Sequence, residues 1–175
     1  MDLPKRKRNR LPNYDYSTPG AYFITICTDG KQCILGRIVG GGALDAPLVQ
    51  LSKCGSIVQK HIQSGNNIPG ITVDKYVIMP NHIHLILLID PAASGAATRA
   101  ASPANAVVPH FVSTLKRFVH RDLGSKIFQR SYHDHVIRDE KDYLKIWRYI
   151  DDNPAKWNED CFYADPRTSA MEEPL

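Results

Sequence analysis

Two histidines stand two residues apart in the segment MPNHIHLILLID, which spans residues 79–90. In a β-strand successive side chains alternate between the two faces, so His82 and His84 project from one face and Ile83 from the other. Imidazole nitrogens are good ligands for several divalent metals. Two such rings on one strand supply half of a metal site, and the remaining ligands must come from elsewhere in the chain.

The histidine pair also has a purely structural interpretation. The two rings could lie on a solvent-facing strand surface, or they could be partly buried with hydrogen bonds to the backbone. The flanking sequence favours a functional role, because residues 85–89 are all apolar, as in a central strand that is covered on both faces. Burying two imidazoles in such a strand without a role would be costly.

Tyr149 and Asn153 are candidates for the second half of the site. On a helix their spacing of four residues places both side chains on one face, about one turn apart. The amide oxygen of Asn153 suits Mg²⁺ or Mn²⁺, which accept oxygen ligands, and Tyr149 would then be the nucleophile. Each residue alone also has a structural explanation, since Tyr149 stands among apolar helix residues and asparagine is common at helix ends.

The composition indicates one domain with a proper core, because the chain has 175 residues. No apolar run approaches the length of about 20 residues that spans a membrane, and no apolar segment follows the basic N-terminus. We therefore expect a cytoplasmic protein without membrane contact. The four cysteines show no Cys-x-x-Cys spacing, which argues against a zinc knuckle and is neutral about disulfides, and we expect reduced thiols.

The net charge is only +4, but the cations are clustered. The first cluster comprises Lys5, Arg6, Lys7, Arg8 and Arg10, and the second comprises Lys116, Arg117, His120, Arg121, Lys126 and Arg130. Such clusters are typical of proteins that bind a polyanion, although each could also be a solvated tail or helix face. We expect Lys116, Arg117 and Arg121 to contact nucleic-acid phosphates, and residues 5–10 to add non-specific affinity or to read a feature of the nucleic acid.

Periodicity and turn residues predict the elements that must position these side chains. In chain order, we expect an extended leader over residues 1–19, a β-hairpin of strands 21–28 and 32–39, a helix over 51–63 capped by Ser52, paired strands over 72–79 and 82–90, a flexible low-complexity loop over 91–109, a helix over 111–123 ended by Gly124, a strand over 133–138 and a helix over 139–152.

Four separated motifs now carry a family resemblance. Residues 79–84, 111–117, 128–138 and 149–154 together resemble the HUH-type single-tyrosine transposases, above all the REP-associated tyrosine transposases of the IS200-like group. The likeness runs from about residue 19 to residue 157. It implies an α+β fold, a ferredoxin-like or RRM-like sandwich whose central antiparallel sheet carries packed helices. It also implies one catalytic domain over residues 20–160, followed by a tail over 161–175.

The resemblance further implies roles for the four candidate residues. His82 and His84 would ligate a divalent metal, Mg²⁺ or Mn²⁺, which Asn153 would share. Tyr149 would attack single-stranded DNA and form a 5′-phosphotyrosine intermediate of transposition. The expected substrate is a hairpin or palindromic repeat, and the resemblance leaves open whether the enzyme is a monomer or a homodimer.

Two other functions remain open at the level of sequence. An RRM-like module could bind nucleic acid without cutting it. A metal-dependent phosphodiesterase could use an activated water instead of Tyr149, and it would then survive the loss of the phenol. His133 and His135 could relay protons or contact phosphates, but their alternation with Asp134 favours a strand surface.

Overall fold

The structure is a computed structural model that describes residues 14–41, 46–90 and 106–163. The predicted basic segment at residues 5–10 lies outside the described residues, as do residues 91–105 of the predicted loop and residues 164–175 of the predicted tail.

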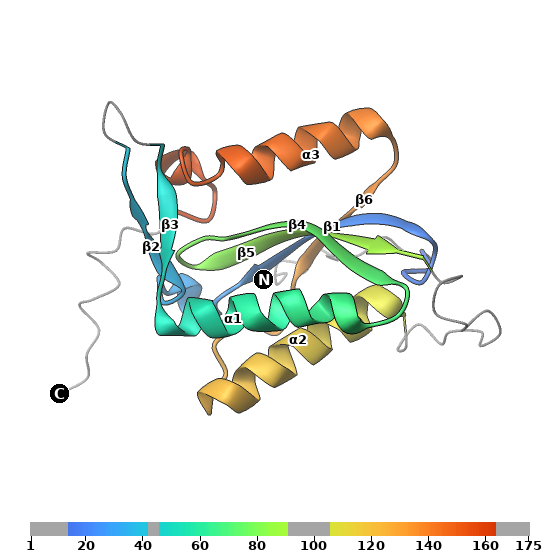
Figure 1. Cartoon of the computed structure of the whole chain (residues 1–175), viewed down its shortest axis with the longest axis horizontal. Coiled ribbons are helices and arrows are strands. Elements are labelled where there is room, and N and C mark those ends of the chain that lie inside the picture. The colour runs from blue at the N-terminus through green and yellow to red at the C-terminus, as the bar shows by residue number, and fades with distance from the viewer. Residues whose placement is uncertain (1–13, 42–45, 91–105, 164–175) are drawn as a thin grey trace, which may run out of the picture.

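Strands and helices follow one another along the chain in the order shown in Figure 1. They are β1 (Gly20–Cys27), β2 (Gly36–Val39), β3 (Leu48–Leu51), α1 (Lys53–Ser64), β4 (Ile71–Ile78), β5 (His82–Ile89), α2 (Val107–Leu123), β6 (His133–Ile137) and α3 (Glu140–Asp152), with short 3-10 helices at Asp29–Lys31, Gly65–Asn67 and Trp157–Glu159. Within the described parts of the chain, no helix combines the length and the apolar character that crossing a membrane requires.

The central sheet has four strands in the order β4-β5-β1-β6, and every neighbouring pair is antiparallel. Helix α1 connects β1 to β4, and α2 connects β5 to β6, which gives the ferredoxin-like order βαββαβ with β2 and β3 inserted before α1. Helices α1 and α2 cover one face of the sheet, and α3 covers the other (Figure 1). The predicted α+β sandwich with a central antiparallel sheet is confirmed, with α3 as the layer over the second face.

The predicted hairpin between residues 21–28 and 32–39 is wrong. Strand β1 pairs with β5 on one side and with β6 on the other, so both of its edges are occupied. Strand β2 pairs instead with β3 in a separate two-stranded sheet. The turn residues Asp29 and Gly30 do bend the chain, but into a 3-10 helix.

The helix predictions hold apart from the starts of α1 and α2. Leu51 was predicted to begin the first helix but is the last residue of β3, and α1 begins at Lys53. The Ser52 side chain caps α1 by accepting a hydrogen bond from the Gly55 backbone N–H, as predicted. Helix α2 ends at Gly124, whose φ of 71° lies in the left-handed region that favours glycine. The loop predicted to reach residue 109 is shorter, because α2 begins at Val107. Pro109 falls in the first helical turn, where a missing N–H costs no helical hydrogen bond.

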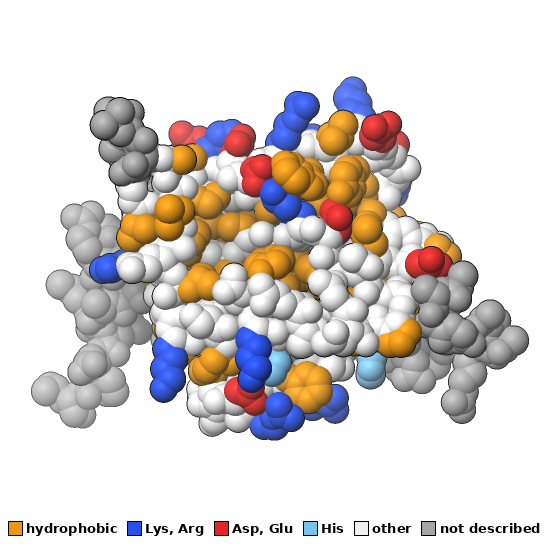
Figure 2. Space-filling view, viewed as in Figure 1, with side chains coloured by type: hydrophobic (Ala, Val, Ile, Leu, Met, Phe, Trp, Pro, Cys, Tyr) orange, Lys and Arg blue, Asp and Glu red, His pale blue; other side chains and the backbone are white. Residues whose placement is uncertain are grey.

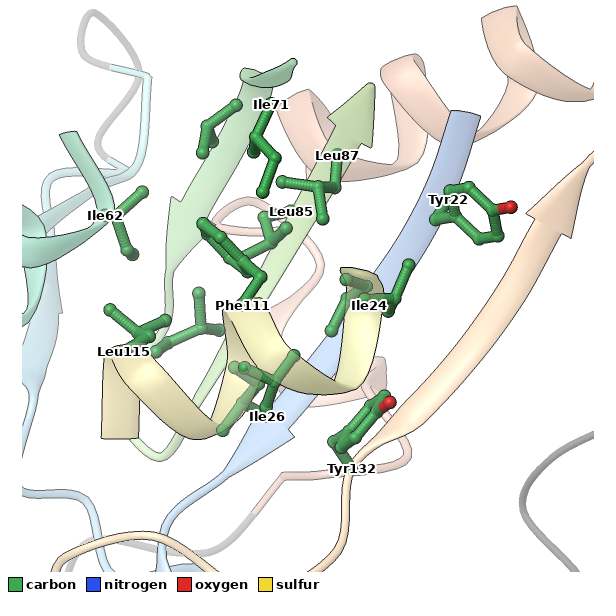
Figure 3. Close-up of a cluster of buried hydrophobic side chains, with 14 of the residues drawn as sticks. Tyr22, Ile24, Ile26, Ile62, Ile71, Leu85, Leu87, Phe111, Leu115 and Tyr132 are labelled. Atoms are coloured by element: carbon green, nitrogen blue, oxygen red, sulfur yellow. The ribbon is translucent and has the colours of Figure 1, made fainter. Parts of the chain in front are cut away.

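Two apolar clusters fill the two sides of the sheet. The larger lies between the sheet and helices α1 and α2, and Figure 3 shows Ile24 and Leu85 of the sheet facing Phe111 and Leu115 of α2. The smaller lies under α3 and comprises Ile86, Ile137, Ile146 and Ile150. Because side chains alternate along β5, odd-numbered residues enter the larger cluster and even-numbered residues face α3.

Truncating Leu85 to alanine tests the larger cluster. Leu85 is fully buried, so Leu85→Ala should lower the free energy of unfolding by about 2–5 kcal/mol through lost burial and a residual cavity. Urea unfolding measures this loss. The matched control is Leu144→Ala on α3, because Leu144 is 44% exposed and should change stability by less than about 0.5 kcal/mol. Equal losses at both positions would contradict the assignment of the core.

Candidate active site

His82 and His84 lie on the α3 face of the central strand β5, as their spacing predicted. Their side chains are buried, with 0% and 1% exposure, and their ring centroids are 4.5 Å apart. On the neighbouring strand β1, Cys27 pairs with His82 and Thr25 pairs with His84. Two imidazoles are therefore buried side by side beneath the helix that carries Tyr149.

Hydrogen bonding fixes which nitrogen of His82 carries the proton. The Asn81 amide nitrogen donates to the carbonyl oxygens of Lys31 and Phe162, at 3.1 and 2.9 Å. The Asn81 Oδ1 atom is therefore an acceptor, and His82 Nδ1, 2.9 Å away, donates to it. His82 Nε2 is left with a buried lone pair that accepts no hydrogen bond from any residue that the structure describes. A buried acceptor without a partner is the arrangement that a metal ligand requires.

The His84 side chain contacts both strand β1 and helix α3. Its Nδ1 lies 2.8 Å from the hydroxyl of Thr25, and its Nε2 lies 3.3 Å from the hydroxyl of Tyr149. Its ring stacks on Phe23 with the centroids 5.1 Å apart. These contacts hold the imidazole so that Nε2 points toward the tyrosine.

Helix α3 presents Tyr149 and Asn153 to the same place, as predicted. Asp139 caps the start of the helix by accepting from the Asp142 N–H, and Ile150 is buried against the sheet. Tyr149 remains 40% exposed, whereas Asn153 is only 2% exposed. Within the described ranges, Asn153 Oδ1 is buried without a hydrogen-bond partner, so it is a second free acceptor in the site.

Asp160 completes the group, and we did not predict it. Its side chain is 2% exposed, and its Oδ2 accepts from the Asn153 amide at 3.0 Å and lies 3.4 Å from the Tyr149 hydroxyl. The same oxygen is 3.9 Å from His82 Nε2. An acidic residue in an irregular segment after a proline has no periodicity that would mark it, so nothing in a single sequence singles it out.

Aromatic rings close one side of the site. Phe162 lies over His82 with ring centroids 4.8 Å apart, and Trp157 lies 5.9 Å from the same ring. Residues 161–175 were predicted as a tail beyond the domain, but Phe162 packs against the histidines, so the packed structure extends past residue 160. His82 is therefore fully covered, whereas Tyr149 remains 40% exposed.

The side chains of this site are suited to holding a divalent cation. His82, His84 and Asp160 each offer one ligand atom, and these atoms all lie within 4.8 Å of one another. The free Oδ1 of Asn153 adds a neutral oxygen. Two imidazoles, one carboxylate and one amide make a mixed nitrogen and oxygen set that fits several divalent metals.

Burial sets the protonation states of the site. It lowers the pKa of His82 to about 4, an effect that the Asp160 carboxylate opposes only in part. Burial and then the neighbouring His82 hold the pKa of His84 well below its usual value. Both imidazoles are therefore neutral at pH 7, as metal ligands must be. Burial, and then the negative charge of Asp160, raise the pKa of Tyr149 to about 12, so its phenol keeps its proton.

Replacing Asp160 with asparagine should lower the pKa of Tyr149. Asp160 disfavours the phenolate in the metal-free protein, but burial is the larger cause and persists in the variant, so the pKa should fall from about 12 without reaching that of a free tyrosine, about 10. NMR titration of carbon-labelled tyrosine would measure it, with Tyr149→Phe identifying the signal. A Tyr149 pKa that did not move in Asp160→Asn would contradict the proposed proximity of the two groups.

The predicted DNA-binding cations of α2 are not part of this cluster. Arg117 and Arg121 are exposed on α2, which covers the opposite face of the sheet, and both guanidinium groups lie over the Phe118 ring, at 5.3 and 4.8 Å. Arg117 also lines a cavity of about 310 Å³, together with Lys126 and Arg130.

The Lys116 side chain extends from α2 to the loop before β6. Its ammonium group donates to the carbonyl oxygens of Gln129, Arg130 and Ser131, at 2.7, 3.4 and 3.0 Å, and burial lowers its pKa to about 8. A phosphate contact would have to replace one of these hydrogen bonds.

His133 and His135 lie on the same sheet face as the histidine pair, because they face Thr25 and Phe23 of β1 in register. Both are exposed. His135 Nε2 lies 2.7 Å from Asp142 Oδ2 at the start of α3, which is the surface arrangement that the sequence favoured. The ring of His133 lies 6.3 Å from that of Phe162, at the margin of the site.

The chain is similar in sequence to one curated protein and in fold to solved structures of transposases. No family model matches it. An uncharacterized protein of Haemophilus influenzae is 34% identical over 180 residues, which cover 91% of this chain and 94% of that protein. The solved structure of a REP-associated tyrosine transposase bound to a REP hairpin has a TM-score of 0.59 and 17% identity, over 84% of this chain and 73% of that one.

A candidate transposase of Deinococcus radiodurans is 16% identical, over 85% of this chain and 96% of that one. Its TM-score of 0.47 is too low to support an argument. The identity and coverage of the Haemophilus influenzae match establish the family, and the architecture shared with the REP-associated tyrosine transposase establishes the fold. The chain belongs to one family with the Haemophilus influenzae protein, and its fold is that of a REP-associated tyrosine transposase.

Proposed function

We propose that this protein is a metal-dependent transposase that cleaves single-stranded DNA and transfers the strand through Tyr149. The observation that carries the proposal is the contact between a nucleophile and a metal-binding group. The Tyr149 hydroxyl lies 3.3 Å from His84 Nε2, within a buried cluster of two neutral histidines and a carboxylate. In this fold such a cluster supports phosphodiester cleavage better than a structural role, since His82 Nε2 and the neighbouring Asn153 Oδ1 are buried and have no hydrogen-bond partner among the described residues.

The side chains of the site divide the work. His82, His84 and Asn153 would hold the divalent metal, Mg²⁺ or Mn²⁺, and Asp160 would supply negative charge that the cation needs. When bound, the metal polarises a phosphoryl oxygen and offsets the charge that develops there. Asp160 Oδ2, 3.4 Å from the Tyr149 hydroxyl, is within reach of the proton that leaves as the oxygen attacks.

The reaction follows from a tyrosine nucleophile. The Tyr149 oxygen forms a bond to phosphorus as the bond from phosphorus to the 3′ oxygen breaks, which leaves a 5′-phosphotyrosine and a free 3′-OH. The tyrosyl ester retains the energy of the broken phosphodiester bond. A 3′-OH from another strand can therefore reverse the attack and join the DNA without ATP.

The proposed substrate is a single-stranded hairpin or palindromic repeat. The fold neighbour was solved with a REP hairpin, and this chain carries exposed cations that suit a nucleic acid backbone. We assign phosphate contacts to Arg117 and Arg121, with Lys116 and the cations of residues 5–10 as further contacts.

Charge reversal on α2 tests this assignment. The double variant Arg117→Glu with Arg121→Glu should bind hairpin DNA about 10-fold or more weakly at low salt, and the slope of affinity against salt should fall by about 1 per lost phosphate contact. Fluorescence anisotropy measures both quantities. The control is Arg37→Glu with Lys53→Glu, which makes the same charge change at exposed positions of β2 and α1. If the α2 variant bound like the control, Arg117 and Arg121 would not be contacts.

A cleavage assay tests the proposed function itself. End-labelled single-stranded hairpins from DNA flanking the gene would be incubated with the protein and either Mn²⁺ or EDTA. We expect metal-dependent cleavage that leaves a free 3′-OH on one product and a protein-blocked 5′ end on the other. Tight hairpin binding without cleavage would instead indicate a binding module, and cleavage that leaves both ends free would indicate a hydrolase that activates water.

A further inference from the structure

We propose that the exposed side of α3 is a binding track for single-stranded DNA, in which Lys141, Lys145 and Arg148 contact successive phosphates of the strand that reaches Tyr149. This inference rests on the proposed function, because it names the surface that delivers the DNA to the same tyrosine. The track is distinct from the cations of α2, which lie over the other face of the sheet (Figure 1).

The track begins with an open hollow of about 640 Å³ on the surface of α3. Lys141, Lys145 and Arg148 all line it, and so does Tyr149. Their spacing of four and three residues places the three cations on one side of the helix. Figure 2 shows Lys and Arg side chains projecting from the edge of the molecule that α3 forms, at the top of the view.

The charges in the hollow are unbalanced. Two carboxylates, those of Glu140 and Asp152, also line it, and Lys156 forms an ion pair with Asp152, with 2.9 Å between nitrogen and oxygen. The other three cations therefore face one remaining carboxylate, that of Glu140. Lys141, Lys145 and Arg148 form no ion pair within the described parts of the chain. Like charges spaced four residues apart destabilise a helix slightly. A bound polyanion would remove this repulsion.

The cations also have the right reach for a DNA strand. From Lys141 to Arg148 the helix rises about 10 Å, at about 1.5 Å per residue. At the axial spacing of about 3.4 Å per charge that one strand of B-DNA has, this length spans about three nucleotides. Leu144, which is 44% exposed, lies between the cations in the same hollow and offers an apolar surface to a base.

Tyr149 determines what kind of polyanion fits the hollow. It lines the hollow directly after Arg148, while its hydroxyl reaches His84 Nε2 at 3.3 Å. A strand lying along the three cations therefore brings a phosphate to the nucleophile without leaving the hollow. An acidic protein partner could satisfy the charges, but it would cover the tyrosine that the strand must reach.

The test is DNA binding by the double variant Lys141→Glu with Lys145→Glu, measured by anisotropy in EDTA so that no cleavage occurs. We expect a single-stranded oligonucleotide to bind about 10-fold or more weakly, with a salt slope smaller by about 2. The control pair Arg37→Glu with Lys53→Glu should bind like the wild-type protein, and thermal melting should show that all three proteins are folded. Binding by the α3 variant equal to that of the control would overturn the track, as would a wild-type protein that binds no DNA.

A second measurement identifies which nucleotides contact the track. The difference in affinity between the wild-type protein and the α3 variant should disappear when about three nucleotides beside the cleavage position are removed from one end of the oligonucleotide. If the difference persisted at every length, the track would be wrong while the proposed function could stand. If the wild-type protein bound DNA through α3 but did not cleave it with Mn²⁺, the proposed function would fail and the track would stand.

Discussion

Tyr149→Phe is expected to abolish cleavage of hairpin DNA and formation of the covalent protein–DNA adduct. The change removes the oxygen that attacks phosphorus in the proposed reaction, so the rate of cleavage should fall on the order of 10⁴-fold or more. The fold should be retained, because Tyr149 is 40% exposed and its hydroxyl contacts, at 3.3 and 3.4 Å, are long. A denaturing gel with end-labelled DNA and Mn²⁺ would display both the cleavage products and the adduct.

The matched control is Tyr143→Phe on the same helix. The Tyr143 hydroxyl donates to Asp74, away from the histidines, so this variant should cleave DNA and form the adduct like the wild-type protein. Cleavage that survived in Tyr149→Phe would contradict the tyrosine mechanism and indicate that the metal activates water.

His84→Gln should remove metal binding and cleavage together. His84 offers one of the ligand atoms in the histidine and aspartate group, and even residues that only support a metal ligand are worth about 10- to 100-fold in affinity. We therefore expect the affinity for Mn²⁺ to fall by more than about 100-fold. Calorimetry on the DNA-free protein measures this directly, without relying on activity.

His135→Gln is the control for this variant. His135 lies on the same face of the sheet, but its imidazole is exposed and contacts Asp142 instead of the cluster, so the affinity for Mn²⁺ should not change. A His84→Gln protein that bound Mn²⁺ as tightly as this control would place the metal elsewhere, and the His82, His84 and Asp160 group would have no role in holding it.

Local sequence rules correctly predicted the direction of a side chain where that direction is set by the strand or helix that carries the residue. Alternation along a strand predicted that His82 and His84 share a face, and the spacing of four residues predicted that Tyr149 and Asn153 do so. Both pairs meet in the structure, because one sheet face is covered by the helix that carries the second pair. Ser52 as a helix cap followed from the same kind of rule.

These local rules did not predict strand pairing or contacts between residues far apart in the sequence. The turn at Asp29 and Gly30 was consistent with a hairpin, but β1 forms its ladders with strands that follow far along the chain, and such pairing leaves no local signal. Asp160 and Phe162 enter the site from a segment without periodicity. Lys116 looked like a surface cation, yet three carbonyl oxygens lie within hydrogen-bond distance of its ammonium group.

The most direct test of the central claim is to identify the amino acid that becomes linked to DNA. The wild-type protein would be incubated with a single-stranded hairpin and Mn²⁺, digested with protease and nuclease, and analysed by mass spectrometry. We expect a peptide in which Tyr149 carries a phosphate joined to the 5′ end of the cleaved strand. Attachment at any other residue, or cleavage without an attached peptide, would contradict it.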